Sequence, residues 1–121
     1  MQKKNLIKIL LVDDDVALRE VLKTMLTNFN VIEADNGKDA VELYRTIKPD
    51  VVLMDIVMPN KNGIDATKEI LEYDPSAKIL AITAYAKSKA KEMMEAGAKE
   101  IISKPIKRRE LIEMIMQYVN K

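Results

Sequence analysis

Short apolar runs alternate along the chain with longer segments in which apolar residues recur every three or four positions. The short runs are rich in valine, isoleucine and leucine, which is typical of strands buried on both faces of a sheet. Most of them are followed by polar residues, glycine or proline, which end a strand. The predicted strands cover residues 9–12, 31–34, 51–54, 78–82 and 100–102.

The segments after these runs have the period of helices with one buried face. We expect Asp15, Asn36 and Asn62 to cap the first three helices, because their side-chain oxygens accept hydrogen bonds from free backbone amides. A fourth helix is expected over residues 86–96 and a fifth over residues 107–119. The buried stripe predicted for the first helix consists of Leu18, Val21, Leu22, Met25, Leu26 and Phe29.

Strands that alternate with helices in this way predict an α/β fold with one parallel sheet covered by helices on both faces. The commonest arrangement of five such strands is the doubly wound, flavodoxin-like (βα)5 fold with strand order 2-1-3-4-5. A length of 121 residues indicates one domain over residues 1–121. In this topology ligands bind beyond the carboxyl ends of the strands, near the switch point between strands 1 and 3.

Polar side chains stand where four of these strands end. Asp13 and Asp14 follow the first strand, Asp55 the third, Thr83 the fourth and Lys104 the fifth. Because the carboxyl ends of parallel strands share one edge of the sheet, we expect these side chains to line one crevice. Three carboxylates in one crevice repel one another unless a cation lies between them. Such hard oxygen ligands favour Mg²⁺, which usually binds together with a phosphate oxygen, so the crevice is expected to handle a phosphoryl group.

Composition excludes several other classes of protein. The chain has no cysteine and no histidine, which rules out disulfides, thiolate metal sites and a phosphohistidine on this chain. A net charge of +1 argues against direct binding of nucleic acid through charge alone. Lys8 interrupts the apolar run near the start and no small-residue cleavage site follows it, so we expect a strand there and not a signal peptide. We therefore expect a cytoplasmic protein that neither inserts into membranes nor binds nucleic acid.

From end to end the chain resembles the receiver domain of bacterial and archaeal two-component response regulators. Each motif is weak alone, but together, in this order and at strand ends, they are specific. The matching segments are Leu11-Val12-Asp13-Asp14, Asp55-Ile56-Val57-Met58-Pro59 with Gly63, Thr83-Ala84, Ala96-Gly97-Ala98 and Lys104-Pro105.

The resemblance implies a switch that is phosphorylated on Asp55. This carboxylate would be the nucleophile that takes a phosphoryl group from the phosphohistidine of a sensor histidine kinase or phosphotransfer protein. Asp14 and Asp55 would bind Mg²⁺ directly, with Mn²⁺ able to replace it. Asp13 would act through water, and the backbone carbonyl of Val57 would complete the protein ligands.

The resemblance also assigns roles to the residues that end the fourth and fifth strands. Lys104 would pair with Asp55 at rest and with the phosphoryl group afterwards, and the Lys104–Pro105 peptide bond would be cis. Thr83 would move inward to bond a phosphoryl oxygen. Phosphorylation and dephosphorylation would rely on positioning and charge neutralisation, so the domain would be mainly a signalling switch and only secondarily an enzyme.

The sequence departs from the family pattern near the output surface. Ile101 stands where the family usually has an aromatic residue, and Ile106 where it often has phenylalanine. In the family, the two positions that Val57 and Tyr85 occupy here flank the path of attacking water. Valine cannot orient a water molecule and tyrosine is bulky, so we expect a comparatively persistent phosphoryl group.

The resemblance places a downstream protein target on the face formed by the fourth helix, the fifth strand and the fifth helix. A docking surface for an acidic partner helix and a merely solvated basic face both fit this pattern. Stand-alone receivers of the chemotaxis or phosphorelay type are the expected relatives, and a receiver cut from a longer protein stays open. The basic residues that gather on this face are Lys87, Lys89, Lys91, Lys99, Lys107, Arg108 and Arg109.

Three other classes of protein share part of this sequence pattern. A haloacid dehalogenase-type phosphatase also uses an aspartate nucleophile, and Asp13 and Asp15 fit its motif, but Ala17 stands where threonine or valine is expected. A flavodoxin-type carrier shares the strand order, but three aspartates after the first strand would repel a flavin phosphate. A receiver-like interaction module that is not phosphorylated generally lacks a site residue, and this chain has them all.

Overall fold

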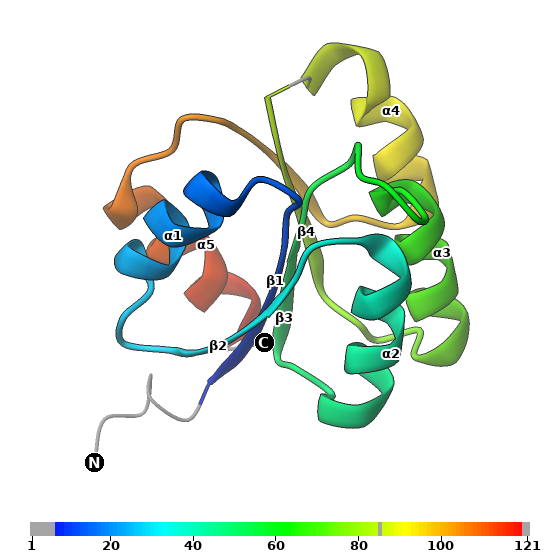
Figure 1. The fold of residues 1–121 in the computed structure, drawn as a ribbon, viewed down its shortest axis with the longest axis horizontal. Helices are drawn as coiled ribbons and strands as arrows, with labels where there is room; N and C mark the ends of the chain where they lie inside the picture. The colour runs from blue at the N-terminus through cyan, green and yellow to red at the C-terminus, as the bar shows by residue number, and fades with distance from the viewer. Residues whose placement is uncertain (1–6, 85, 120–121) are drawn as a thin grey trace.

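The computed structural model describes the backbone of residues 7–84 and 86–119, with the side chains of residues 86–88 left out (Figure 1). Within these ranges strands and helices alternate throughout. The strands are β1 (Lys8–Val12), β2 (Asn30–Ala34), β3 (Val51–Met54), β4 (Ile79–Thr83) and β5 (Glu100–Ser103). The helices are α1 (Val16–Met25), α2 (Gly37–Ile47), α3 (Gly63–Tyr73), α4 (Ala86–Ala96) and α5 (Arg108–Val119).

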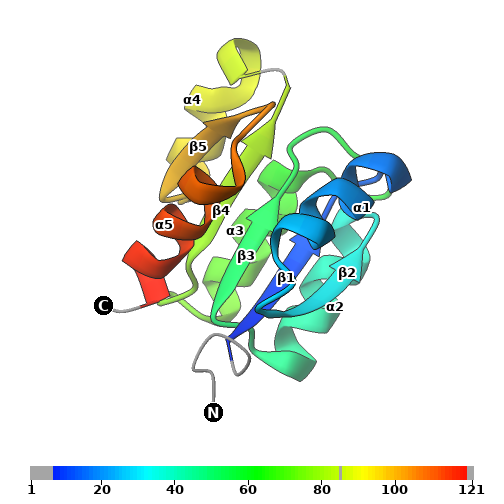
Figure 2. The ribbon, with the colours of Figure 1, turned by 90° about the vertical axis from the view of Figure 1, so that its left-hand side faces the viewer.

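The strands form one parallel sheet in the order β2-β1-β3-β4-β5, which confirms the predicted topology. Figure 1 shows the sheet nearly edge-on, with α1 and α5 on one face and α2, α3 and α4 on the other. Turned by 90°, the strand arrows all run toward the same edge of the sheet (Figure 2). The loops that carry the predicted site residues therefore gather at that edge.

Two apolar cores, one on each face of the sheet, hold these layers together. Alternate residues of β1 point to opposite faces, so Leu10 and Val12 pack under α2 and α3 while Ile9 and Leu11 pack under α1 and α5. Every residue of β3 is buried. Strands buried on both faces read as continuous apolar runs, which is why the sequence pattern located them.

The helix starts follow the predicted caps. The side chain of Asp15 accepts a hydrogen bond from the backbone amide of Leu18 at the start of α1, at 3.2 Å. Asn36 and Asn62 cap α2 and α3 in the same way, at 2.9 and 3.0 Å from the amides that they receive. No helix in the described part of the chain is long and apolar enough to cross a membrane.

The buried stripe predicted for the first helix is wrong at Val21 and too long. The helix α1 ends at Met25 with Leu26 as its C-cap, so Phe29 packs from the following turn. Val21 is 50% exposed, because a helix that covers one face of a sheet buries only the narrow strip that meets the strands. Its side chain lies on the rim of a small apolar pocket with Met25 and Pro105.

Candidate phosphoryl-acceptor and metal site

An open crevice of about 410 Å³ lies at the carboxyl ends of β1, β3 and β4 and beside the loop after β5. It is the place where the switch-point topology predicts a ligand, because α-helical connections leave β1 and β3 in opposite directions there. The described residues that line it are Asp13, Asp14, Asp15, Leu18, Asp55, Val57, Ala84 and Lys104.

Asp13 is held in a fixed orientation at the end of β1. It is only 2% exposed, and its backbone amide donates to the carbonyl of Ala34 at 3.1 Å. One carboxylate oxygen accepts from the amide of Asp15 at 2.9 Å, and the other accepts from Lys104 Nζ at 2.9 Å. A buried carboxylate needs such partners, because an unpaired charge in the interior is costly.

Asp55 lies at the end of β3, where its amide continues the ladder by donating to the carbonyl of Val12 at 2.8 Å. Its carboxylate accepts from the amide of Ile56 at 2.9 Å and lies 3.8 Å from Lys104 Nζ. Burial raises the pKa of Asp55 to about 6, helped by the negative charge of Asp13, while Lys104 and the Ile56 amide act in the opposite direction. The carboxylate is therefore held in an electrostatically unfavourable place that a cation would relieve.

The donor set of the crevice fits a divalent cation that prefers oxygen. Asp13, Asp14 and Asp55 each offer a carboxylate oxygen, and these atoms all lie within 4.8 Å of one another. Asp14 is exposed, so its carboxylate can exchange water for a metal ion without moving buried neighbours. With neither histidine nor cysteine in the chain, these hard ligands suit Mg²⁺ and not zinc.

The structure brings most of the predicted site residues into this crevice. Lys104 forms the expected ion pair with Asp55, at 3.8 Å, and in addition a closer one with Asp13, at 2.9 Å. Its peptide bond to Pro105 is cis, as predicted. Thr83 is fully buried at the end of β4, and its carbonyl accepts from the amide of Lys104 at 3.0 Å.

Val57 and Tyr85 are the two positions predicted to flank the path of attacking water. Val57 is 53% exposed and lines the crevice. Tyr85, the other predicted flanking residue, lies outside the described residues.

Gly63 closes the loop that carries Asp55 and should not tolerate a side chain. A Cβ atom at this position would overlap the backbone carbonyl oxygen of Asp55. We expect Gly63→Ala to destabilise the protein by about 1–3 kcal/mol, because the clash is with backbone that must shift. Urea unfolding measures this effect, and Lys68→Ala on the exposed face of α3 should change the free energy of unfolding by less than about 0.5 kcal/mol. Equal stability of Gly63→Ala and wild type would contradict the close approach.

The raised pKa of Asp55 predicts how stability depends on pH in the absence of metal. A folded-state pKa of about 6, above the ordinary 3.8, means that the folded protein holds the Asp55 proton more tightly than the unfolded chain does. This carboxyl therefore lowers stability as pH rises through roughly 4 to 6. Relative to wild type, Asp55→Asn should gain on the order of 1–2 kcal/mol between pH 4 and pH 7, less than the full shift because water reaches the crevice.

Urea unfolding in EDTA at the two pH values gives this difference directly. Comparison of the variant with wild type cancels the carboxyl groups that lie away from the crevice, among them Asp74, whose hydrogen bonds from Ser76 and Tyr44 lower its pKa. A constant difference between variant and wild type across this range would contradict the electrostatic origin of the shift.

Comparison with known proteins assigns the class. Residues 9–116 match the family model of the response regulator receiver domain, which spans most of the chain. The chain belongs to this family. It is 44% identical to the chemotaxis protein CheY of Thermotoga maritima over 112 residues, which cover 89% of this chain and 93% of that protein. It is also 40% identical to CheY of Bacillus subtilis, over 93% of this chain and 98% of the relative.

Solved structures support the same fold. The receiver domain of the sensor histidine kinase PA1611 from Pseudomonas aeruginosa PAO1, solved with a magnesium ion in its active site cleft, superposes with a TM-score of 0.90. The sequences are 29% identical, and the match covers 94% of this chain and 98% of that one. CheY in the CheX-CheY-BeF3-Mg²⁺ complex from Borrelia burgdorferi has a TM-score of 0.84 at 33% identity, with 92% and 87% of the two chains covered.

Membership of this family favours the receiver domain over the other classes of protein that share part of the sequence pattern. The chain is a response regulator receiver domain of two-component signalling, and the phosphatase and interaction-module alternatives are not favoured. Receiver domains bind Mg²⁺ at an aspartate cluster, which here consists of Asp13, Asp14 and Asp55. They pair with kinases and with target proteins.

Two residues next to the crevice were not found from the sequence. Leu18 lines the crevice from the first turn of α1. Arg19 reaches back from the same turn and donates to the backbone carbonyl of Asp13 at 2.7 Å. The position of Arg19 in the sequence could have indicated this contact. A long basic side chain one helical turn after a cap can reach the loop that precedes the helix.

Proposed function

We propose that Asp55 accepts a phosphoryl group from the phosphohistidine of a sensor histidine kinase or phosphotransfer protein. The observation that supports this most is the cluster of three carboxylates, Asp13, Asp14 and Asp55, in which Asp55 also faces Lys104. An Asp55 oxygen attacks phosphorus, the phosphorus–nitrogen bond of the donor breaks, and the imidazole leaves with the electron pair. The product is an acyl phosphate on Asp55.

The surrounding residues stabilise the charge that moves in this step. Asp14, Asp55 and the backbone carbonyl of Val57 would hold Mg²⁺, or Mn²⁺ in its place, with Asp13 contributing through water. A bound divalent cation would supply positive charge next to the carboxylates and the incoming phosphoryl oxygens. Lys104 already bridges two carboxylates and exchanges one of them for a phosphoryl oxygen, and Thr83 bonds another.

The proposal includes a protein target on the face formed by α4, β5 and α5. The described basic side chains on this face, at Lys89, Lys91, Lys99 and residues 107–109, are all exposed, and Met94 beside them is 45% exposed. A basic surface with an exposed apolar residue suits an acidic amphipathic helix. In this proposal the domain, residues 1–121, acts in the cytoplasm without direct binding of nucleic acid, as a stand-alone chemotaxis- or phosphorelay-type receiver.

Small phosphodonors test the proposed chemistry without a cognate kinase. Incubation with acetyl phosphate or phosphoramidate and Mg²⁺ should add one phosphoryl group, detected by intact mass. EDTA should prevent the addition, Mn²⁺ should restore it, and ATP should not act as a donor because the chain has no glycine-rich phosphate loop. No uptake with Mg²⁺ present would overturn the proposal, and sustained release of phosphate from a general phosphomonoester would favour a phosphatase instead.

Val57 should set the lifetime of the phosphoryl group. Its exposed side chain lines the crevice but offers no hydrogen bond to a water molecule. We expect Val57→Asn to speed hydrolysis roughly tenfold, and more when combined with Tyr85→Glu, because an amide or carboxylate can orient water. Decay is followed after removal of the donor, with Val21→Asn, a similarly exposed valine on α1, as the control. Unchanged or slower decay would show that these positions do not limit hydrolysis.

A further inference from the structure

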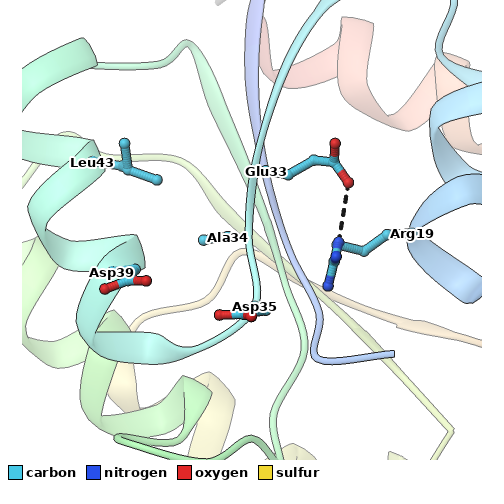
Figure 3. Close-up of a pocket in the computed structure, with 6 residues that line it drawn as sticks. All are labelled: Arg19, Glu33, Ala34, Asp35, Asp39 and Leu43. Atoms are coloured by element: carbon cyan, nitrogen blue, oxygen red, sulfur yellow. Dashed lines mark hydrogen bonds and ion pairs between the residues drawn. The ribbon is translucent and has the colours of Figure 1, made fainter. Parts of the chain in front are cut away.

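Arg19, a partly buried arginine, connects the loop over residues 13–15 to strand β2 at the edge of the sheet. Arg19 lies in the first turns of α1, and its side chain is only 15% exposed. Its Nη1 atom donates to the backbone carbonyl of Asp13 at 2.7 Å, and its Nε atom donates to Glu33 on β2 at 3.0 Å. Figure 3 shows the guanidinium facing the Glu33 carboxylate, on the opposite side of β2 from Asp39 and Leu43 of α2.

The Asp13 carbonyl needs such a partner because the sheet ladder stops there. The amide of Asp13 donates to the carbonyl of Ala34, the last residue of β2. The next ladder donor would be the backbone amide of Asn36, but among the described residues no hydrogen bond joins that amide to the Asp13 carbonyl. The Arg19 guanidinium takes the place of the missing ladder donor, and a charged donor forms a stronger hydrogen bond than a neutral amide does.

Arg19 also holds the other end of the same loop. Its backbone amide donates to the carbonyl of Asp15 at 3.0 Å, so one residue fixes the carbonyls at both ends of the Asp13–Asp15 segment. Between these ends lies Asp14, which is exposed and has no regular structure around it. Within the segment, the amide of Asp15 donates to the Asp13 carboxylate at 2.9 Å. The Arg19 side chain therefore fixes the backbone where this segment begins, and the Arg19 amide makes the first helical hydrogen bond of α1 where it ends.

The arginine is itself held in place. Glu33 accepts from Arg19 through one oxygen and pairs with Lys23 through the other at 3.1 Å. A planar guanidinium can satisfy two acceptors at fixed angles, which a lysine ammonium on a flexible stem cannot do as rigidly. Arg19 is not among the described residues that line the crevice, so it acts on the metal site through Asp13 and not by contact.

We propose that Arg19, anchored by Glu33, is a positioning residue that orients the Asp13–Asp14 loop for Mg²⁺ binding. This inference rests on the proposed function, since it concerns the same metal site. Residues that orient metal ligands without touching the ion typically contribute ten- to a hundredfold in affinity. We expect Arg19 to contribute about tenfold to the affinity for Mg²⁺, the lower end of this range, because other hydrogen bonds also hold the loop.

Charge and positioning predict opposite results for one substitution. Arg19→Met removes a positive charge near the carboxylates, which by electrostatics alone would strengthen Mg²⁺ binding. Loss of positioning should instead weaken it by about tenfold. Arg19→Lys keeps the charge but lacks the planar guanidinium that donates to two acceptors. Its affinity for Mg²⁺ should therefore lie between those of wild type and Arg19→Met. Arg45→Met, which removes a charge on α2 over the Tyr73 ring, should leave the affinity nearly unchanged.

Amide exchange without metal supplies a second readout. In EDTA the Asp15 amide, which donates to Asp13, should exchange faster in Arg19→Met than in wild type, while amides in β3 keep their relative protection. If Arg19→Met does not fold, Glu33→Gln loosens the same arginine and should raise the exchange rate of Asp15 as well. Mg²⁺ affinity in Arg19→Met equal to or tighter than wild type, or an unchanged Asp15 exchange rate, would overturn the inference.

The two proposals fail separately. Wild type that takes up no phosphoryl group would contradict the proposed function, while the Mg²⁺ titration and amide exchange would still decide the role of Arg19. In the converse case, wild type is phosphorylated normally while Arg19→Met binds Mg²⁺ as tightly as wild type does. That pair of results would support the proposed function and would exclude a role for Arg19 in it.

Discussion

Asp55→Asn is expected to abolish the uptake of a phosphoryl group from acetyl phosphate in the presence of Mg²⁺. An amide oxygen is a poor nucleophile, and it cannot form the acyl phosphate that a carboxylate forms. The fold should persist, because asparagine has nearly the same shape and its side-chain oxygen can still accept from the Ile56 amide. Intact mass after incubation with the donor, followed by peptide mapping, measures both the extent and the site of labelling.

Asp15→Asn is the matched control for this substitution. Asp15 lines the same crevice, but it caps α1, a role that asparagine fills equally well, so labelling should stay close to wild type. Equal labelling of Asp55→Asn and wild type would contradict the assignment of the acceptor. Retained labelling at another residue would mean that a neighbouring carboxylate can replace Asp55.

Asp14→Ala should lower the affinity for Mg²⁺ by about a hundredfold or more. Asp14 is the exposed member of the carboxylate cluster, and a direct ligand should matter at least as much as the residues that orient it. Without metal the variant should be as stable as wild type or more stable, because one of three mutually repelling charges is gone. The chain has no tryptophan to report binding, so calorimetry or NMR titration is the suitable measurement.

Two comparisons make the Asp14 result specific. Asp14→Asn keeps an oxygen ligand without the charge and should lose less affinity than Asp14→Ala. Glu72→Ala removes an exposed carboxylate on α3 and should leave Mg²⁺ binding unchanged. An unchanged affinity in Asp14→Ala would show that the ion does not bind where these carboxylates meet.

Local signals in the sequence predicted the strands and helices and the edge of the sheet where the polar side chains meet. Strands buried on both faces appear as continuous apolar runs, and helix starts carry capping side chains, so both signals are local. Asp13, Asp55 and Lys104 could be placed in one crevice because parallel strands present their carboxyl ends at the same edge. The strand order was predicted as the commonest arrangement of five such strands, and the structure confirmed it.

The contacts between these side chains depend on how distant segments pack and could not be predicted from the sequence. Val21 fits the helical period but is exposed, because the width of the contact with the sheet is not encoded in spacing. Lys104 lies closer to Asp13 than to Asp55, since the loop after β5 sets its reach across the crevice. Burial next to Asp13 raises the pKa of Asp55, which depends on surroundings contributed by distant segments. The Arg19–Glu33 contact likewise joins residues that pattern does not pair, because side chains that meet across elements are chosen by packing in three dimensions.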